Sequence, residues 1–149
     1  MIHNKIRTVL ITGASSGLGE EFCKQLAKSE INLIMVARRE ERLLELKRRF
    51  NPSVTSIHLV IAELSTVHGI AHVQEVIRQE SPVDLLINNA GFSAYGPFSD
   101  SSLATQLAIT RVQIEATLSL TRAVLPFMRD QNFGRIINVS SIGAFISLK

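Results

Sequence analysis

The sequence is poor in the features that mark secreted and membrane-embedded proteins. Its only cysteine is Cys23, so no disulfide can form within the chain, and a reducing compartment is expected. Apolar runs such as residues 33–37 fall far short of the roughly 18 residues that a spanning helix requires. The N-terminal residues lack the apolar segment and the cleavage site of a signal peptide. We therefore expect a cytoplasmic protein with no membrane association.

Signals for nucleic-acid and metal binding are also missing. The formal charge is only +3, and no aromatic interleaving or recognition motif accompanies the basic runs at residues 38–39 and 47–49. His68 and His72 are one helical turn apart, but no glutamate follows His68 directly and no third ligand is evident. We therefore expect neither a nucleic-acid partner nor a metal site.

The composition that is present is that of a folded globular domain, with 46% hydrophobic and 19% charged residues. A chain of 149 residues is long enough for one buried core and too short for a second domain of ordinary size. We therefore treat residues 1–149 as a single domain.

Short apolar runs alternate with amphipathic stretches along the whole chain. The runs rich in Val, Ile and Leu predict strands at residues 7–12, 32–37, 56–61, 84–88 and 135–140. Helices are predicted at residues 17–29, 40–50, 67–80 and 102–131, and Pro126 is expected to bend or interrupt the last one. Right-handed crossovers then give an α/β fold, a Rossmann-like doubly wound parallel sheet with helices on both faces. In such a sheet, functional residues lie just after the strands.

The first predicted strand runs into a glycine loop, Thr-Gly-Ala-Ser-Ser-Gly-Leu-Gly at residues 12–19, and a helix follows. A pyrophosphate needs backbone N–H groups free of neighbouring Cβ atoms and the positive end of a helix, which this loop can supply. By position, Gly13 allows a tight turn, Gly17 a close approach of the ligand, and Gly19 close packing of helix and strand. The loop therefore predicts a single dinucleotide-binding domain.

The serines of this loop have two interpretations. The Ser15 and Ser16 hydroxyls can bond phosphate or ribose oxygens, or they can cap the helix, and both roles can coexist. Glu20 follows the last glycine where a Walker A motif requires lysine, so hydrolysis of a nucleoside triphosphate is disfavoured.

Two more motifs accompany the loop, because Asn-Asn-Ala-Gly at residues 88–91 closes the fourth strand and Ile-Asn-Val-Ser-Ser at residues 137–141 closes the fifth. In order and spacing, the three motifs resemble those of the short-chain dehydrogenase/reductase family, and the resemblance covers nearly the whole chain. It implies an oxidoreductase that transfers hydride between a nicotinamide cofactor and a small alcohol or carbonyl substrate. It also implies that the glycine loop, Leu18 included, binds the cofactor.

The resemblance places the adenosine ribose at the end of the second strand. There this chain has Ala37 in place of the carboxylate that would favour NAD, followed by Arg38 and Arg39. A guanidinium can hold a 2′-phosphate, so NADP is expected rather than NAD, with Arg38 as the first choice for the contact. The alternative is that both arginines are solvated and pair with charged neighbours at residues 40–42.

Other cofactor contacts follow from the resemblance by position. Glu63 and Leu64 stand where the family usually has Asp and an apolar residue that contact the adenine. Asn88 is expected to brace the central strands. The next residues match the family's contacts to the nicotinamide-side ribose: Asn89, Ala90 and Gly91.

The resemblance also implies a catalytic set of Tyr, a Lys four residues later, a Ser that polarises the substrate oxygen and an Asn that supports a proton relay. Ser141 matches the Ser. Gln113 occupies the Asn position on the long helix, where its extra methylene displaces the amide. The only tyrosine, Tyr95, is followed four residues later by Ser99 rather than Lys.

The Tyr and Lys are expected on the helix that would follow Ser141, about a dozen residues or more along the chain. Only eight residues follow Ser141; Phe145 and Lys149 share the spacing, yet phenylalanine has no transferable proton. We therefore expect a domain that is incomplete at its C-terminus, lacks the family's C-terminal strands and is inactive by itself. The alternatives are a non-catalytic nucleotide-binding module and a non-functional truncated product.

Two exposed surfaces are expected as a result. The fifth strand becomes an edge strand. The long fourth helix, which forms part of a subunit interface in the family, keeps apolar positions such as Leu107 and Leu118. We therefore expect the isolated chain to be poorly soluble or to form a homo-oligomer through this helix.

Overall fold

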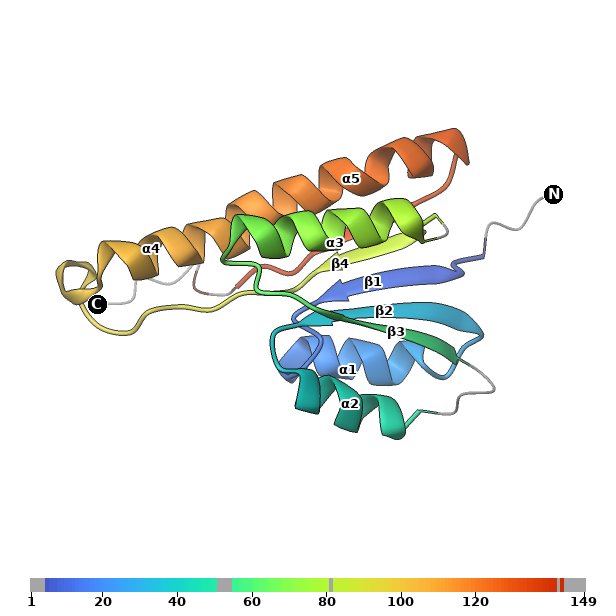
Figure 1. Cartoon of the computed structure of the whole chain (residues 1–149), viewed down its shortest axis with the longest axis horizontal. Helices are drawn as coiled ribbons and strands as arrows, with labels where there is room; N and C mark the ends of the chain where they lie inside the picture. Colours follow the sequence, from blue (N-terminus) through green and yellow to red (C-terminus); the bar gives the residue numbers. More distant parts are fainter. Residues whose placement is uncertain (1–4, 51–54, 81, 142, 144–149) are drawn as a thin grey trace.

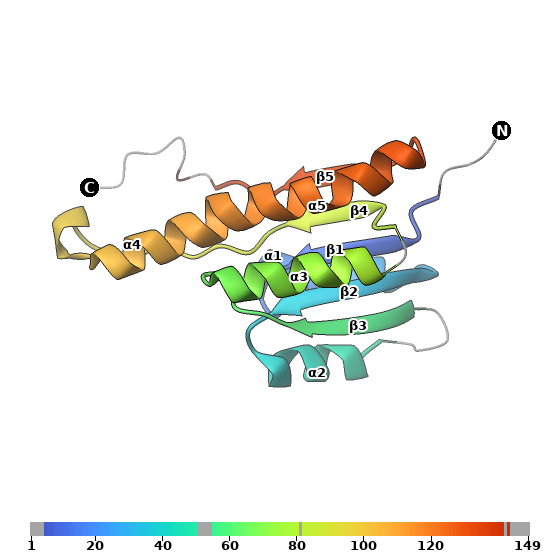
Figure 2. The same cartoon turned by 45° about the horizontal axis from the view of Figure 1, so that its top comes forward.

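The computed structural model describes residues 5–50, 55–80, 82–141 and 143. They form one five-stranded sheet of order β3-β2-β1-β4-β5, with neighbouring strands parallel (Figures 1 and 2). The strands are β1 (Thr8–Thr12), β2 (Ile31–Ala37), β3 (Thr55–Ile61), β4 (Leu85–Asn88) and β5 (Arg135–Asn138). The chain adds β2 and β3 on one side of β1, then crosses over and adds β4 and β5 on the other. This is the doubly wound Rossmann-like order that the sequence predicts.

Helices cover both faces of the sheet (Figure 1). One face carries α1 (Gly17–Leu26) and α2 (Glu40–Arg48), and the other carries α3 (Val67–Gln79) and α5 (Thr117–Asp130). Before α5, α4 (Leu103–Thr110) extends past the carboxyl ends of the strands, preceded by a short 3₁₀ turn, η1 (Phe98–Asp100). The crevice at these carboxyl ends therefore lies between the two helical layers.

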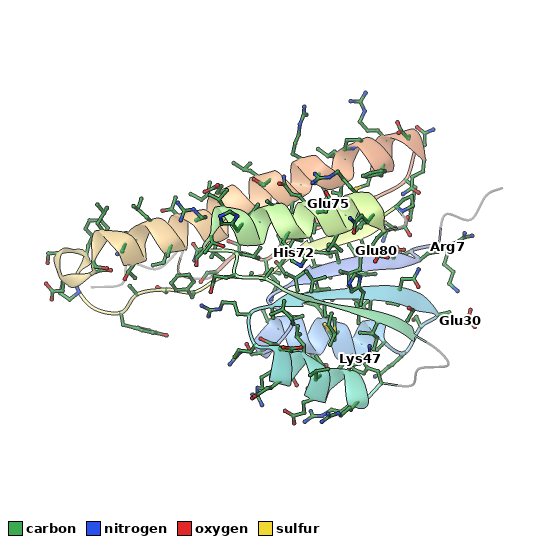
Figure 3. The ribbon with its side chains drawn as sticks, in the orientation of Figure 1. Arg7, Glu30, Lys47, His72, Glu75 and Glu80 are labelled. Atoms are coloured by element: carbon green, nitrogen blue, oxygen red, sulfur yellow. The ribbon has the colours of Figure 1, made fainter. Side chains whose placement is uncertain are left out.

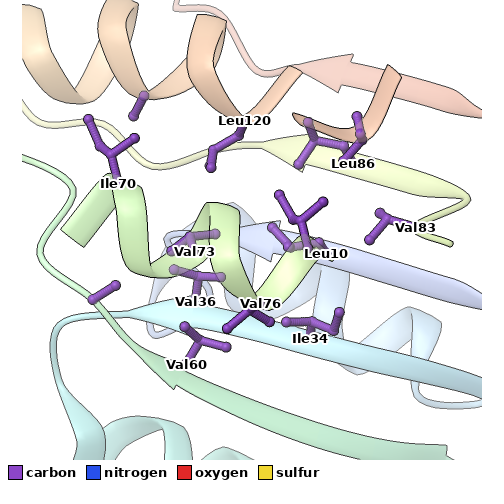
Figure 4. Close-up of a cluster of buried hydrophobic side chains, with 14 of the residues drawn as sticks. Leu10, Ile34, Val36, Val60, Ile70, Val73, Val76, Val83, Leu86 and Leu120 are labelled. Carbon is purple, nitrogen blue, oxygen red and sulfur yellow. The ribbon is translucent and has the colours of Figure 1, made fainter. Parts of the chain in front are cut away.

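The core has two halves because successive residues of a strand point to opposite faces of the sheet. Val9 and Ile11 of β1 pack with the α1 and α2 side, whereas Leu10 packs with the α3 and α5 side. Figure 4 shows the second half, where Val73 and Leu120 meet the sheet. All five residues of β1 are buried, so the strand that leads into the glycine loop is firmly anchored in the core.

The long fourth helix differs from the prediction in its interior. A π-helical turn, η2 (Arg111–Ala116), joins α4 to α5. Pro126 lies inside α5, which continues to Asp130, so of the two expected effects of this proline, a bend or an interruption, the interruption does not occur. Val124 and Met128 on either side of Pro126 are buried, and this packing stabilises the helix across the missing N–H.

A buried carboxylate ties the amino ends of the strands together, at the opposite end of the sheet from the glycine loop. Asp84 Oδ2 accepts hydrogen bonds from the backbone N–H of Arg7 at 2.8 Å and of Thr8 at 3.0 Å. Its Oδ1 accepts one from Gln131 Nε2 at 3.0 Å, and Asp84 is only 6% exposed. Figure 3 shows Arg7 at this end of β1. Asp84 thus joins β1, the start of β4 and the end of α5.

Candidate nucleotide-binding site

A cleft of about 1050 Å³ opens where the strands end at their carboxyl side. Most of the site residues that the sequence predicts line it: Gly13, Ser15, Ser16, Leu18, Arg38, Glu63, Leu64, Asn89, Ala90, Gly91, Gln113 and Ser141. Gly17 and Gly19 belong to the same loop without lining the cleft. Arg39, which the sequence ranked behind Arg38 for the 2′-phosphate contact, and Phe92 also line it. Parallel strands bring these distant residues to one edge of the sheet.

The glycine loop has the backbone that its sequence implies. Gly13 and Gly17 have φ angles of +69° and +57°, in the left-handed region that favours glycine. A Cβ on Gly19 would collide with the Gly13 carbonyl oxygen and lie 2.5 Å from Asn89 Nδ2. A Cβ on Gly17 would meet nothing within 4 Å, so this side of the loop is open. The loop is therefore packed on its inner side and free on the side that a ligand would approach.

Thr12 fastens the end of β1 to the end of β4. Its Oγ1 accepts hydrogen bonds from the backbone N–H groups of Asn89 and Ala90, both at 3.0 Å. In return, Asn89 Nδ2 donates to the carbonyls of Thr12 at 2.9 Å and Gly13 at 3.3 Å. The Asn89 side chain is therefore occupied in holding the glycine loop. This leaves Ala90 and Gly91 as the open part of the predicted ribose contact.

The two loop serines bond to an arginine that lies between β2 and α2. Arg39 Nη2 donates to Ser15 Oγ at 3.1 Å and to Ser16 Oγ at 2.9 Å. Ser16 is the N-cap residue of α1, yet its side chain makes no capping hydrogen bond. Of the two interpretations for Ser16, capping is therefore not observed. The hydrogen-bond partners of the Arg39 guanidinium here are thus hydroxyls rather than a carboxylate.

Arg38 is paired with a carboxylate instead. Its Nη1 lies 3.1 Å from Glu63 Oε2, while Glu63 Oε1 accepts from the Ser65 backbone N–H at 3.0 Å and from Ser65 Oγ at 2.8 Å. Partial burial raises the pKa of Glu63, but the hydrogen bonds from Ser65 and the pairing with Arg38 outweigh it and hold this pKa below its usual range. Glu63 is thus a carboxylate at neutral pH. Neither arginine pairs with residues 40–42, so that alternative was wrong in its choice of partners.

The opposite end of the cleft contains the two residues predicted for catalysis. Gln113 lies in the π-helical turn, and its Nε2 donates to the Phe92 carbonyl at 2.7 Å. Ser141 follows β5, and its Oγ accepts from the Gly143 backbone N–H at 3.1 Å. Tyr95 is 99% exposed in the loop after β4. Phe145 and Lys149 lie outside the described residues.

Asn88 braces the sheet, as its position predicts. It is 6% exposed, and its Nδ2 donates to Asn138 Oδ1 of β5 at 2.9 Å and to Thr121 Oγ1 of α5 at 3.3 Å. The ends of β4 and β5 are thereby held together beneath the cleft.

In the described part of the chain, no three metal-binding side chains gather, and none of the helices combines the length and apolar character that crossing a membrane would need.

Comparison with known proteins gives consistent matches. Residues 7–149 match the family model described as short chain dehydrogenase. Human dehydrogenase/reductase SDR family member 7 is 34% identical over 145 residues, which are 94% of this chain and 43% of that protein. The NADP-dependent 3-hydroxy acid dehydrogenase of Schizosaccharomyces pombe is 36% identical over 143 residues, 91% of this chain and 54% of that protein. The chain thus spans about half the length of the curated relatives it matches.

A solved structure matches over nearly the whole fold. The short-chain dehydrogenase from Sphingobium yanoikuyae in complex with NADPH superposes with a TM-score of 0.88 at 31% identity. The match covers 93% of this chain and 55% of that one.

Proposed function

The chain belongs to the short-chain dehydrogenase family, and we propose that it is the NADP-binding part of an oxidoreductase that acts on an alcohol or carbonyl group. The observation that carries the choice of NADP is the pair of arginines after β2, with Ala37 where a carboxylate would favour NAD. An NADP-dependent relative and an NADPH-bound relative support it. The single cysteine suits a cytoplasmic protein, and we propose that location.

The residues of the cleft fit a dinucleotide from end to end. The open outer side of Gly17 and the N-terminus of α1 suit the pyrophosphate. Arg39 with its two serine hydroxyls, and Arg38 beside them, would bracket a 2′-phosphate. Glu63 and Leu64 would border the adenine, while Ala90 and Gly91 would border the second ribose. We expect Arg39, which bonds to hydroxyls, to contribute most of the charge that attracts the phosphate, and Arg38, which Glu63 holds in place, to contribute a positioned hydrogen-bond donor.

At the other end, Ser141 is suited to hold the substrate. NADPH, when bound, supplies a hydride, and the substrate oxygen then needs a hydrogen-bond donor. Because Ser141 Oγ accepts from the Gly143 N–H, its own hydroxyl hydrogen is available to a substrate oxygen. Gln113 is committed to the Phe92 carbonyl. We propose that Gln113 positions this loop and that Ser141 polarises the substrate.

Binding of NADPH is the direct test. We expect the 149-residue chain to bind NADPH about tenfold more tightly than NADH, and Arg39→Ala to remove this preference by weakening NADPH alone. Fluorescence titration of the reduced nucleotides measures both constants. Arg122→Ala, on the exposed side of α5, is the matched control and should change neither. Equal affinity for NADPH and NADH in the unchanged chain would contradict the choice of NADP.

Turnover is not expected from this polypeptide alone. Its only tyrosine, Tyr95, is fully exposed. Four residues later the chain has Ser99, where the family's catalytic tyrosine is accompanied by a lysine. We therefore propose that residues 1–149 bind the nucleotide without reducing a carbonyl. NADPH consumption by the purified chain, with a panel of ketones and aldehydes, would contradict this.

The long helix offers a surface for self-association. Four apolar side chains on one side of it are between 52% and 74% exposed: Leu103, Leu107, Ile114 and Leu118. Exposed apolar stripes of this kind mark contacts with other proteins. We propose that a second copy covers this stripe. Sedimentation should therefore show a dimer or larger species, and the double change Leu107→Glu with Leu118→Glu should shift it to monomer; a monomer at all concentrations would contradict the proposal.

A further inference from the structure

One side-chain hydrogen bond connects the long helix to the loop between β3 and α3, next to residues of the cleft. Arg111 Nη1 donates to the carbonyl oxygen of Ser65 at 2.8 Å, across 46 residues of sequence. Arg111 begins the π-helical turn that also contains Gln113, whereas Ser65 lies in the loop between β3 and α3. The guanidinium is held at a second point, because its Nε bonds to Glu115 Oε2 at 3.1 Å. Its side chain is 35% exposed.

From Ser65 the hydrogen bonds continue to the predicted phosphate contact. Ser65 donates twice to Glu63 Oε1, and Glu63 Oε2 receives Arg38. Arg38 and Glu63 line the cleft, whereas Arg111 and Ser65 do not. A series of hydrogen bonds therefore runs from the long helix to the proposed adenosine end of the site, through Arg111, Ser65, Glu63 and Arg38.

The hydrogen bonds of Ser65 and Arg111 fix a geometry that the Arg38–Glu63 pair would not hold by itself. The side chains of Arg38 and Glu63 are 63% and 38% exposed, and an isolated pair of that kind holds a long arginine only weakly. Glu63 gains its orientation from the two Ser65 bonds, and the Ser65 carbonyl is fixed by a guanidinium that is itself bonded twice. A positioned arginine loses less side-chain entropy when a phosphate binds.

We propose that Arg111 is a positioning residue for NADP selectivity, acting through Ser65 and Glu63 to hold Arg38 where a 2′-phosphate would bind. The proposal rests on the NADP binding proposed above. It assigns a role in recognition of the adenosine end to a residue of the helix that forms the opposite end of the cleft. Its effect should fall on the nucleotide that carries the 2′-phosphate, since NADH has no group for Arg38 to meet.

The test is a titration of Arg111→Met in the full 149-residue chain with NADPH and NADH. We expect NADPH to bind about fivefold more weakly and NADH to change less than about twofold. Arg111→Lys should recover part of the NADPH affinity, because an ammonium can still donate to the Ser65 carbonyl. Arg78→Met is the matched control, because Arg78 also pairs with a helical carboxylate, Glu75, but on the exposed side of α3. Figure 3 labels Glu75 on this helix, and both affinities should stay unchanged.

A second variant tests the route. If Arg111 acts through Glu63, then adding Arg111→Met to Glu63→Gln should weaken NADPH no further than the larger single effect. Equal weakening of both nucleotides by Arg111→Met, together with a lower melting temperature, would assign Arg111 a structural role only and overturn the proposal. Unchanged NADPH affinity in a folded Arg111→Met variant would overturn it as well. If the unchanged chain binds neither nucleotide, the proposed function itself fails; if it binds NADPH selectively, only this inference is at stake.

Discussion

Thr12→Val is expected to lower the free energy of unfolding by about 3 kcal/mol, because two backbone N–H groups lose their acceptor. The Thr12 hydroxyl serves Asn89 and Ala90 at once, and Thr12 is only 2% exposed, so water has little room to replace it. Valine has nearly the same shape as threonine, which keeps the packing of β1 intact. The loss therefore reports the hydroxyl itself. Urea denaturation of the two proteins measures it.

Thr12→Ser is the matched control, since it keeps the hydroxyl and removes one methyl group. Its cost should stay near 1 kcal/mol. NADPH affinity should fall in the valine variant as well, because Ala90 and the glycine loop lose their common anchor. A valine variant within about 1 kcal/mol of the unchanged chain would show that the contact between the ends of β1 and β4 does not depend on this hydroxyl.

Asp84→Ala should also destabilise the fold by about 3 kcal/mol, but without altering the nucleotide site. The substitution leaves the buried N–H group of Thr8, the partly buried N–H group of Arg7 and the Gln131 amide without their acceptor. Asp84 lies at the amino ends of the strands, whereas the cleft lies at their carboxyl ends. Folded Asp84→Ala protein should therefore bind NADPH like the unchanged chain. Thermal denaturation and NADPH titration on the same sample separate the two effects.

Asp130→Ala, at the exposed end of α5, is the control for removal of a carboxylate and should leave stability within about 0.5 kcal/mol. If Asp84→Ala had no more effect than this control, the three hydrogen bonds to Asp84 would contribute little net stability. If it abolished NADPH binding in folded protein, the two ends of the sheet would be coupled in a way that the contacts around Asp84 do not explain.

Much of the fold could be predicted from local sequence. β3 and β5 begin or end within two residues of their predicted positions, and the parallel order follows from alternation of strand and helix. The π-helical turn before α5 was not foreseen, because residues 111–116 have no proline or glycine that would mark an irregular turn. Pro126 is a residue that would signal an irregular turn, yet packing around Val124 and Met128 kept its helix continuous.

The residues that form the candidate site were predicted better than the contacts that they make. The glycine loop is a local motif, and its residues appear where the motif places them. Gln113 was predicted in the family's Asn position with its amide displaced, but the sequence did not predict that this amide donates to the Phe92 carbonyl. Arg39 was treated as the lesser arginine, yet it is the one that meets the loop serines. These contacts join residues more than 20 positions apart, so no local pattern could predict them.

The sequence by itself determined the kind of site, because backbone torsions at Gly13 and Gly17 and the strand that precedes them depend on neighbouring residues. Only the tertiary structure decided which partner each of the two arginines contacts. The ends of β1, β2 and β3 come together when the parallel sheet forms. That assembly places Arg38 beside Glu63 and Arg39 beside the loop serines. Local patterns place a charge at the end of a strand, and the packing of neighbouring strands selects its partner.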